Sequence, residues 1–488
     1  MAAPQEIVFA SSDPKVSRAV SRQLDQGTLR KLAPKIYSTN LADAPEAIVQ
    51  RNLFLILGHL YPKALLSHRS AMEFQPTATG QLFLTYTYTR KILLPGITLR
   101  FLEGPPPAEG DRIFSGQLHV SQRERAFLEN LQTSRKHGPD SKTLSFPELE
   151  ERLEQIIRVN GEEALNAMRD RAQVLSVKLG MKKEFSMLNK LCSALLSTHP
   201  AKMLTSPVAA ARAMGSPYDP ARIELFASLF QTLQKSEFKY HPEPNTSTRA
   251  FRNFAFFESY FSNYIEGTVF ELPEAREIVA SQRPLTARNE DSHDILGTYQ
   301  LVSSPEEMQL LPETANDLLD ILKRRHKILL SARKEQLPGQ FKTQNNFAGQ
   351  TAFVDRYLVR GTLIKAFDYY RVLVHPFARA AYLMFVISEV HPFQDGNGRI
   401  ARVMMNAELV HGNQAKIIIP TVYRDDYLGT LRQLTRRKDP ISYLRMLARA
   451  HAFSATIAGE DEQVMERQLE RSNAFMEHTE GILQVISD

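Results

Sequence analysis

Hydrophobic and polar positions divide the chain into a mixed N-terminal part and a helical C-terminal part. Apolar and polar residues alternate at Gln81–Tyr88 and Ile97–Leu102, which predicts short strands. From about Ala221 to Ala452 the apolar spacing is mostly helical, with one non-helical insertion near Leu337–Val354. The pattern predicts a mainly α fold class, with a small α+β unit ahead of a helical domain.

Breaks in this pattern divide the chain further. A helix–helix–hairpin pattern, typical of a winged helix, covers the first segment, and a polar stretch around Gly138–Pro139 is typical of a linker. The tail after Glu460 is charged and predicts one exposed helix. The predicted segments are a winged-helix-like unit over 1–45, a small α+β unit over 46–131, a helical connector over 141–220, an all-helical domain over 221–454 and a helical tail over 455–488.

Composition narrows the class of protein. The 488 residues include 60 Lys and Arg against 54 Asp and Glu, and a formal charge of +6 gives only a weak overall field. One cysteine, Cys192, excludes an internal disulfide framework and suits a reducing compartment. No apolar run is long enough to cross a bilayer, and the first residues do not resemble a secretory signal. We therefore expect a cytoplasmic protein without a membrane partner.

One turn combines several features of an anion-binding site. Within His391–Arg402, Gly396 and Gly398 flank Asn397, and a helical pattern begins directly afterwards. Such a turn directs backbone N–H groups into a concavity at a helix N-terminus, where anions bind. This part of the sequence predicts a cradle for phosphate groups.

The side chains around this turn fit the same chemistry. Arg399, Arg402 and Asn406 are spaced three and four residues apart, so they share one helix face and suit phosphate oxygens and a base edge. Asp395 supplies a carboxylate for Mg²⁺ beside bound phosphates. His391 can act as a base near neutral pH. Together these residues predict a metal-bound nucleotide site with a base beside it.

The segment HPFQDGNGRIAR resembles the Fic motif, His-x-Phe-x-(Asp/Glu)-Gly-Asn-Gly-Arg-x-x-Arg, at each fixed position. The similarity continues upstream through His375–Ala381 and downstream through Ile417–Tyr427. The resemblance implies an enzyme that transfers AMP from ATP, with Mg²⁺, to a Ser, Thr or Tyr hydroxyl of a target protein.

The resemblance also implies roles for the residues of the motif. His391 would take the proton of the target hydroxyl, and Asp395 would hold Mg²⁺ on the phosphates. Asn397 and the N–H groups around Gly396 and Gly398 would stabilise the developing charge.

Further residues carry implied nucleotide contacts. Arg399 would bind the outer phosphates and Arg402 the γ-phosphate. By analogy with the family, Asn406 and Tyr427 would lie near the adenine.

A second motif implies regulation. Ser262–Gly267 fits the family's inhibitory pattern (Ser/Thr)-x-x-x-Glu-(Gly/Asn), with Ser262 and Glu266 on one helix face and Gly267 after them. Glu266 would pair with Arg402, occupy the γ-phosphate position and leave ATP in an unproductive pose. In some relatives this glutamate orients water for removal of AMP, so deAMPylation stays open. An ordinary helix end at Gly267 is the structural alternative.

The non-helical insertion corresponds to the place of a hairpin flap in family members. The flap grips the backbone of the target by strand addition. It follows Pro338–Lys342 and comprises Asn346, Phe347, Ala348, Gly349, Gln350, Thr351, Ala352 and Phe353.

The basic residues of the first segment suit binding to DNA. Arg18 and Arg22 share a helix face, and Arg30 and Lys31 lie on the predicted wing. Ser17–Tyr37 and the unit after it resemble the N-terminal part of AbiEi-type antitoxins and related regulators. The alternative is a solvated basic face on a docking domain.

Other interpretations stay open. The chain could be a DNA-binding regulator that senses ATP through its Fic domain, or a toxin–antitoxin fusion. The helical block Phe146–Leu196 indicates only packing or formation of a homodimer. His326 has no partner at metal-ligand spacing, so we expect no metal there, and Cys192 fits a core position.

Overall fold

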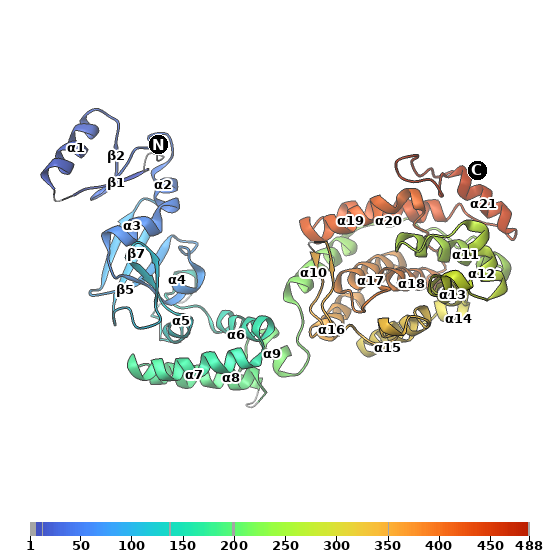
Figure 1. Ribbon diagram of the computed structural model, residues 1–488, viewed down its shortest axis with the longest axis horizontal. Coiled ribbons are helices and arrows are strands. Elements are labelled where there is room, and N and C mark those ends of the chain that lie inside the picture. Colours follow the sequence, from blue (N-terminus) through green and yellow to red (C-terminus); the bar gives the residue numbers. More distant parts are fainter. Residues whose placement is uncertain (1–5, 12, 136–137, 198–200, 350, 487–488) are drawn as a thin grey trace. The chain divides into compact units, whose positions relative to one another are not determined.

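The computed structural model describes residues 6–11, 13–135, 138–197, 201–349 and 351–486 (Figure 1). The chain divides into two compact units, unit 1 with Met1–Gly215 and unit 2 with Ser216–Asp488. Helices dominate the described residues, which confirms the predicted mainly α fold class. No helix of the described residues is both long and apolar enough to span a bilayer.

Unit 1 begins with a strand rather than a helix in the described residues. The elements are β1 Ile7–Phe9, α1 Pro14–Asp25, β2 Arg30–Ala33 and β3 Ile36–Ser38, with the antiparallel order β1-β3-β2. The helix–helix–hairpin prediction is therefore wrong in its first element, because the β-forming Ile-Val-Phe run pairs with β3.

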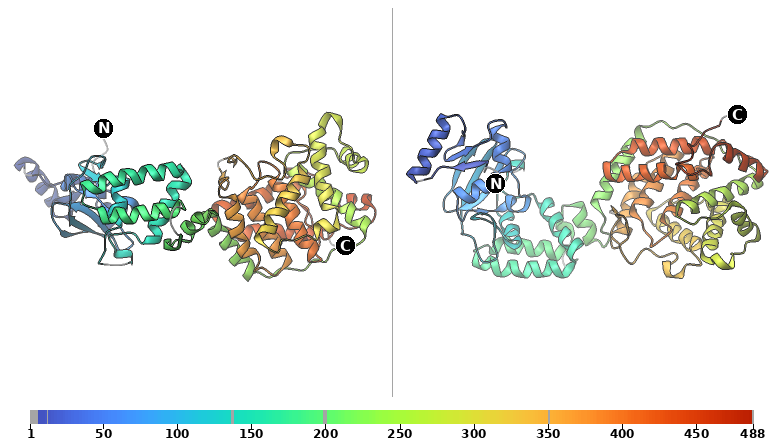
Figure 2. Two further views of the ribbon diagram at one scale, coloured as in Figure 1. Left: turned by 90° about the horizontal axis from the view of Figure 1, so that it is seen from below. Right: turned by 45° about the horizontal axis from the view of Figure 1, so that its top comes forward.

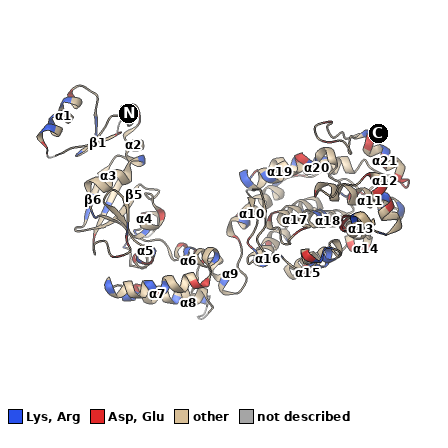
Figure 3. Ribbon diagram, in the orientation of Figure 1, with Lys and Arg blue, Asp and Glu red and all other residues tan. Residues whose placement is uncertain are grey.

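Helix α1 carries basic residues on an exposed surface (Figure 3). Val20 is its buried residue, and Arg18 and Arg22 are both exposed. On the hairpin, Lys31 is exposed, whereas Arg30 donates to the backbone carbonyl oxygens of Asn40 and Asp43. Arg30 is thus partly committed to the fold, and DNA binding through this face stays a prediction.

A mixed six-stranded sheet follows, with the order β6-β7-β5-β4-β9-β8. Strands β5 and β7 are parallel, as are β4 and β9, and the other neighbours are antiparallel. The alternation had not indicated the edge strands β6 and β8, which are largely exposed. The strands are β4 Leu65–Leu66, β5 Gln81–Tyr86, β6 Arg90–Leu94, β7 Ile97–Glu103, β8 Arg112–Ser115 and β9 Leu118–Val120.

The helices of unit 1 enclose two cores. The first core joins β1 to β3 with the six-stranded sheet, so the predicted boundary at residue 45 does not separate two cores. The second core lies among α5 to α9. The helices are α2 Pro45–Arg51, α3 Leu53–Leu60, α4 His68–Glu73, α5 Arg123–Asn130, α6 Phe146–Asn160, α7 Glu162–Lys178, α8 Lys182–Leu195 and α9 Pro207–Ala213, with 3-10 turns at Gly138–Asp140 and Ala201–Met203.

Helix α5 is fixed by a buried charge cluster. Arg125 is 0% exposed and pairs with Asp111 at 2.7 Å and with Glu129 at 2.8 Å. Its guanidinium also donates to the carbonyl oxygens of Pro105 and Pro106. Because both carboxylates are as buried as the arginine, each charge depends on its partners.

Replacing Arg125 with alanine should destabilise unit 1 by about 3–5 kcal/mol, because Asp111 and Glu129 would stay buried without a counter-charge. Urea unfolding followed by circular dichroism measures the loss. Arg123→Ala is the control, since this neighbour is exposed and should change stability by less than about 0.5 kcal/mol. Equal stability of the two variants would contradict the proposed role of the cluster.

Unit 2 is helical in its described residues apart from a small hairpin and an isolated bridge, as predicted. Helices α17 and α18 pack side by side at its centre (Figures 1 and 2), and α17 is buried along most of its length. The elements are α10 Pro220–Lys235, α11 Thr248–Ile265, α12 Leu272–Ser281, α13 Asn289–Val302, α14 Pro305–Met308, α15 Ala315–Leu329, β10 Phe347–Ala348, β11 Thr351–Ala352, α16 Val359–Tyr370, α17 Pro376–Val390, α18 Asn397–His411, α19 Arg424–Arg437, α20 Pro440–Ser454 and α21 Glu462–Arg471, with 3-10 turns at Thr286–Arg288, Lys334–Gln336 and Thr421–Tyr423.

The tail is packed rather than exposed. Met465 and Leu469 of α21 are 0% exposed, and the Phe475 ring lies 5.2 Å from the ring of Phe261 on α11. The prediction of one exposed helix is wrong, because apolar residues four positions apart bury one face of α21.

Candidate functional site

The site forms where α17 ends and α18 begins. His391 closes α17 in the left-handed region, with φ 51°, and Gly396 precedes α18 with φ 74°. Glycine adopts this conformation without the steric cost of a Cβ. The chain thereby reverses between two buried helices and directs the N-terminus of α18 toward His391.

Two side chains hold this loop in place. Asn397 accepts from the Phe393 N–H at 2.8 Å and donates to the Phe393 carbonyl at 2.9 Å. His326 accepts from the Gly339 N–H at 2.9 Å, so its Nε2–H donates to the Asp395 carbonyl at 3.1 Å. Its ring stacks on Phe393 with a centroid distance of 3.8 Å.

These contacts change the view of two residues. The amide of Asn397 is engaged by the loop backbone, so in this structure it shapes the turn. For His326 the sequence predicted only that no metal binds there. In the structure this histidine supports the motif loop. No spacing rule would have linked this histidine on α15 to a loop so far along the chain.

His391 has the hydrogen bonds of a neutral base. Its Nδ1 lies 3.1 Å from the Ser388 carbonyl oxygen, which can only accept, so Nδ1 carries the proton and Nε2 keeps its lone pair. The ring stacks on Phe353 at 3.8 Å with an angle of 8° between the planes. Burial lowers the pKa of His391 to about 4, so the imidazole is neutral at physiological pH.

The pKa of His391 predicts how the rate of the implied AMP transfer depends on pH on the acid side. The charged form is disfavoured, so His391 stays deprotonated as the pH falls from 8 to about 5, and the rate should be lost only as the pH approaches 4. The kcat/KM of an uninhibited variant, measured over this range, checks it. A rate that falls tenfold between pH 7 and pH 5.5 would show an ordinary histidine pKa and contradict the buried environment.

Arg402 is bound by the motif predicted to be inhibitory. Its guanidinium pairs with Glu266 at 2.7 Å and donates to the Ser262 hydroxyl at 3.0 Å and to the Ser262 carbonyl at 2.8 Å. Arg402 is 4% exposed. Ser262 and Glu266 therefore converge on one arginine of α18, as their spacing on α11 predicts, and Gly267 follows with φ 92°.

The Glu266 carboxylate also covers the N-terminus of α18. A Cβ on Gly398 would overlap with Oε1 of Glu266 and lie 3.1 Å from a guanidinium nitrogen of Arg402. A helix N-terminus carries partial positive charge and unpaired N–H groups, which favour an anion. Glu266 is therefore an internal anion at the place where the sequence predicts phosphate.

Arg399 is held by a residue that the sequence did not indicate. It pairs with Asp294 at 2.8 Å and with Asp395 at 3.4 Å, and it donates to the Asn263 side chain at 3.2 Å. Asp294 is 1% exposed and also pairs with Arg333. The Asp294 carboxylate on α13 thus fixes the position of Arg399, the first arginine of the motif.

The two residues predicted near the adenine are buried in this structure, and their contact with adenine stays a prediction. Asn406 is 0% exposed, and its amide is used by Glu258 at 2.8 Å and by the backbone of Ile417. Tyr427 is 1% exposed, and its hydroxyl lies 3.4 Å from Arg402. Both side chains are buried and hydrogen-bonded within unit 2, Asn406 on α18 and Tyr427 on α19.

The predicted flap is a hairpin of β10 and β11, which pair antiparallel. Phe347 is 66% exposed, and the hairpin is two-stranded, so its edges suit the addition of another strand. Arg222 of α10 donates to the Ala352 carbonyl at 2.7 Å. The predicted contact at Gln350 lies outside the described residues.

The base of the flap is tied to the motif loop. Lys342 is 4% exposed, and its ammonium donates to the Asn346 side chain at 2.7 Å. Asn346 donates to the Phe393 carbonyl at 2.9 Å, and the Lys342 N–H donates to the Pro392 carbonyl at 2.9 Å. Burial lowers the pKa of Lys342 to about 8. The flap, the loop and His391 therefore form one connected site.

Asp395 is the carboxylate that fits a metal ion. Its side chain is 47% exposed and shares one oxygen with Arg399. No cluster of three or more His, Cys, Asp or Glu ligands occurs among the described residues. This donor set fits Mg²⁺, which binds through one or two carboxylates, substrate phosphates and water, and it does not fit a metal held by protein ligands alone.

Comparisons with known proteins agree with this geometry. The Fic/DOC family model matches residues 316–409, which run from α15 to α18. Protein adenylyltransferase Fic of Drosophila virilis is 24% identical over 217 residues, covering 42% of this chain and 43% of that protein. Its counterpart in Drosophila willistoni is 26% identical over 214 residues, with coverage of 42% of each chain. The matched segment thus spans less than half the length of these relatives.

Solved structures give weaker matches. Fic-1 (aa134–508) from C. elegans shares 18% identity and covers 68% of this chain and 89% of its own, with a TM-score of 0.37. The assignment of the segment therefore rests on the family model and on the motif residues.

Proposed function

We propose that this chain, whose residues 316–409 form a Fic/DOC-family segment, transfers AMP from ATP to a hydroxyl side chain of a target protein. The observation that carries the proposal is the grouping of a neutral base, His391, with two arginines and the N-terminus of α18, which Glu266 covers in this structure. The relatives named protein adenylyltransferase support it.

The chemistry follows from the residues around the turn. Nε2 of His391 accepts the proton of the target hydroxyl, whose oxygen forms a bond to the α-phosphorus of ATP as the bond to pyrophosphate breaks. Backbone N–H groups at Gly396 and Gly398 stabilise the negative charge that develops. Arg399 and Arg402 bind the outer phosphates and hold the leaving group in line.

Mg²⁺ belongs to this proposal as the partner of ATP. Asp395 would hold it, because its carboxylate lies at the mouth of the turn and is half-exposed. The ion would supply charge neutralisation on the phosphates.

The structure supports restraint by Glu266. Its carboxylate is bound to Arg402 and lies over Gly398, so ATP phosphates compete with it for the same positive groups. The enzyme in this state is inhibited by its own α11. The same carboxylate could instead orient water for the removal of AMP, and deAMPylation is the alternative activity of this site.

The remaining partners follow from other surfaces. A target segment would add to the flap as a strand. DNA would bind the basic face of α1, and the helical block of unit 1 could mediate a homodimer. A regulator that senses ATP without turnover would not need the lone pair on His391, so we favour the enzyme. A toxin–antitoxin fusion would use the same base, and it differs from the enzyme only in that the N-terminal half or Glu266 restrains a toxic activity.

Mass spectrometry tests the proposal. An acceptor protein incubated with ATP, Mg²⁺ and the Glu266→Gly variant should carry AMP on Ser, Thr or Tyr, and His391→Ala introduced into that variant should leave it unmodified. Phosphate on the acceptor in place of AMP would contradict the proposed attack on the α-phosphorus.

A further inference from the structure

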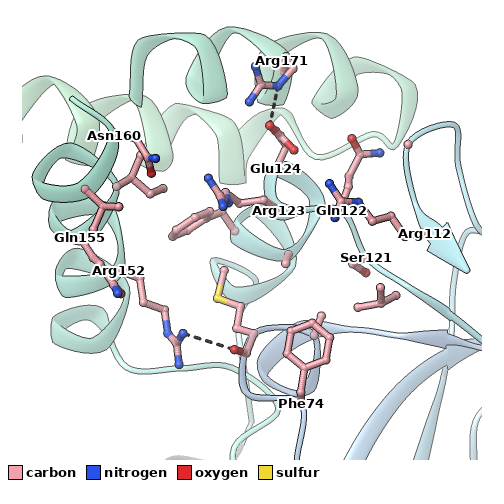
Figure 4. Close-up of a pocket in the computed structure, with 18 residues that line it drawn as sticks. Phe74, Arg112, Ser121, Gln122, Arg123, Glu124, Arg152, Gln155, Asn160 and Arg171 are labelled. Atoms are coloured by element: carbon pink, nitrogen blue, oxygen red, sulfur yellow. Dashed lines mark hydrogen bonds and ion pairs between the residues drawn. The ribbon is translucent and has the colours of Figure 1, made fainter. Parts of the chain in front are cut away.

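Unit 1 contains a cavity that the proposed function does not use (Figure 4). Its volume is about 810 Å³, within the range of about 300–1,000 Å³ that small-molecule sites occupy. The walls come from α4, the start of β8, the turn from β9 into α5, and the helices α6 and α7.

Four arginines from four different elements line this cavity. Arg112 lies on β8, Arg123 on α5, Arg152 on α6 and Arg171 on α7, and Figure 4 shows Arg123 between Arg152 and Arg112. The only acidic residue in the lining is Glu124, which pairs with Arg171 at 2.6 Å. The lining therefore carries an excess of positive charge.

Three of these arginines form no direct ion pair among the described residues, although the charge of Arg152 helps to lower the pKa of the Glu148 carboxyl. Within the part of the chain that the structure describes, no carboxylate forms an ion pair with Arg112, Arg123 or Arg152. Arg152 donates only to the Met72 carbonyl, at 3.4 Å. Ion pairs satisfy many other arginines of unit 1, such as Arg69 and Arg125. Guanidinium groups that converge without carboxylates suit phosphate oxygens.

The N-terminus of α5 opens onto the same cavity. Gln122 is its N-cap and makes no side-chain capping bond, and its own N–H donates to the buried Asp111 carboxylate at 2.9 Å. Gln122, Arg123 and Glu124 all line the cavity. The first N–H groups of a helix and its dipole favour an anion in this position. Backbone and side-chain donors therefore meet in one place.

The positions of these donors are fixed by the fold. The buried Arg125 cluster anchors α5, whose Ala126 lies in the first core and whose Phe127 lies in the second. Phe74 at the cavity edge has φ 54° and is 44% exposed. A left-handed phenylalanine is rare, so its ring is held at this edge at a conformational cost.

We propose that this cavity binds a nucleotide, distinct from the ATP of unit 2. Its phosphates would lie among Arg112, Arg123 and Arg152 at the N-terminus of α5. Its base would lie against Phe74 and the apolar wall, which includes Val159. The combination of an aromatic ring, an apolar wall and uncompensated arginines matches a ligand that is flat at one end and anionic at the other.

Equilibrium dialysis of the full chain with each of the four radiolabelled ribonucleoside triphosphates tests the inference. The double variant Arg123→Ala with Arg152→Ala should lose one equivalent of bound nucleotide per chain, or bind it at least about tenfold more weakly, for one or more of the four. Arg90→Ala on β6 is the matched control, since this arginine is exposed in the same unit and lies outside the cavity. It should bind as the wild type does.

Further variants keep the test decisive. Should the double variant fail to fold by circular dichroism, Arg112→Glu at the exposed rim takes its place, with the same expected loss. Unchanged stoichiometry and affinity for all four nucleotides would overturn the inference. A variant that loses binding of a single-stranded oligonucleotide but of no mononucleotide would also overturn it and assign the cavity to nucleic acid. The result does not depend on whether unit 2 transfers AMP.

Discussion

Replacing Glu266 with glycine is expected to raise the rate of AMP transfer about 10- to 100-fold. The substitution removes the carboxylate that pairs with Arg402 at 2.7 Å and covers Gly398. A hydrogen bond between charged groups contributes about 1.5–3 kcal/mol, and each 1.4 kcal/mol corresponds to about tenfold. Release of pyrophosphate in the presence of an acceptor protein measures the rate.

The control for this variant is Glu237→Gly. Glu237 lies in an exposed position after α10, away from α18, and its replacement should leave the rate unchanged. Glu266→Gln should lie between wild type and Glu266→Gly, because the amide keeps the shape of the side chain but loses its charge. A Glu266→Gly protein that binds ATP and is no faster than wild type would remove the inhibitory role.

Replacing His391 with alanine in the uninhibited variant should lower AMP transfer about 10²- to 10⁴-fold, the usual contribution of a general base. Binding of ATP should persist, because in the proposed site Arg399, Arg402 and the N-terminus of α18 would hold the phosphates. The loss should therefore appear in kcat, and direct titration with ATP separates it from a loss of binding.

His411→Ala is the matched control for this substitution. His411 ends α18 and is exposed, so the rate of its variant should equal that of the parent. An active His391→Ala protein would show that another group takes the proton. The buried His326 could not be that group, because both of its ring nitrogens are already bonded to backbone.

The sequence predicted those parts of the site whose geometry depends on residues close together along the chain. His391, Gly396 and Gly398 belong to one turn, so their spacing alone places them around a helix N-terminus. A second motif predicted that Glu266 pairs with Arg402, and the ion pair between them agrees with this prediction. The predicted contact of Asn406 with adenine stays a prediction, and in this structure the Asn406 amide is bonded to Glu258 and to the backbone of Ile417.

Other features depended on long-range packing. Asp294, His326 and Phe353 lie on elements whose hydrophobic pattern shows only helices and a hairpin, and tertiary structure alone brings them to the motif. In unit 1 the short edge strands β6 and β8 lack a clear alternation, because most of their positions are exposed and no buried face selects apolar residues at every second position. The arginines of the cavity come from four elements, and α4 adds a further wall, so no segment of the sequence indicated it.

Labelling of a cell lysate with ATP carrying ³²P on the α-phosphate tests the central claim most directly. The lysate is incubated with Mg²⁺ and wild type, Glu266→Gly, or Glu266→Gly combined with His391→Ala. We predict weak labelling of protein by wild type, strong labelling by Glu266→Gly and none by the double variant. ATP labelled on the γ-phosphate should give the same protein labelling, from the kinases of the lysate, in all three lanes. Absence of α-label from all three proteins, with ATP binding intact, would contradict AMP transfer by this chain.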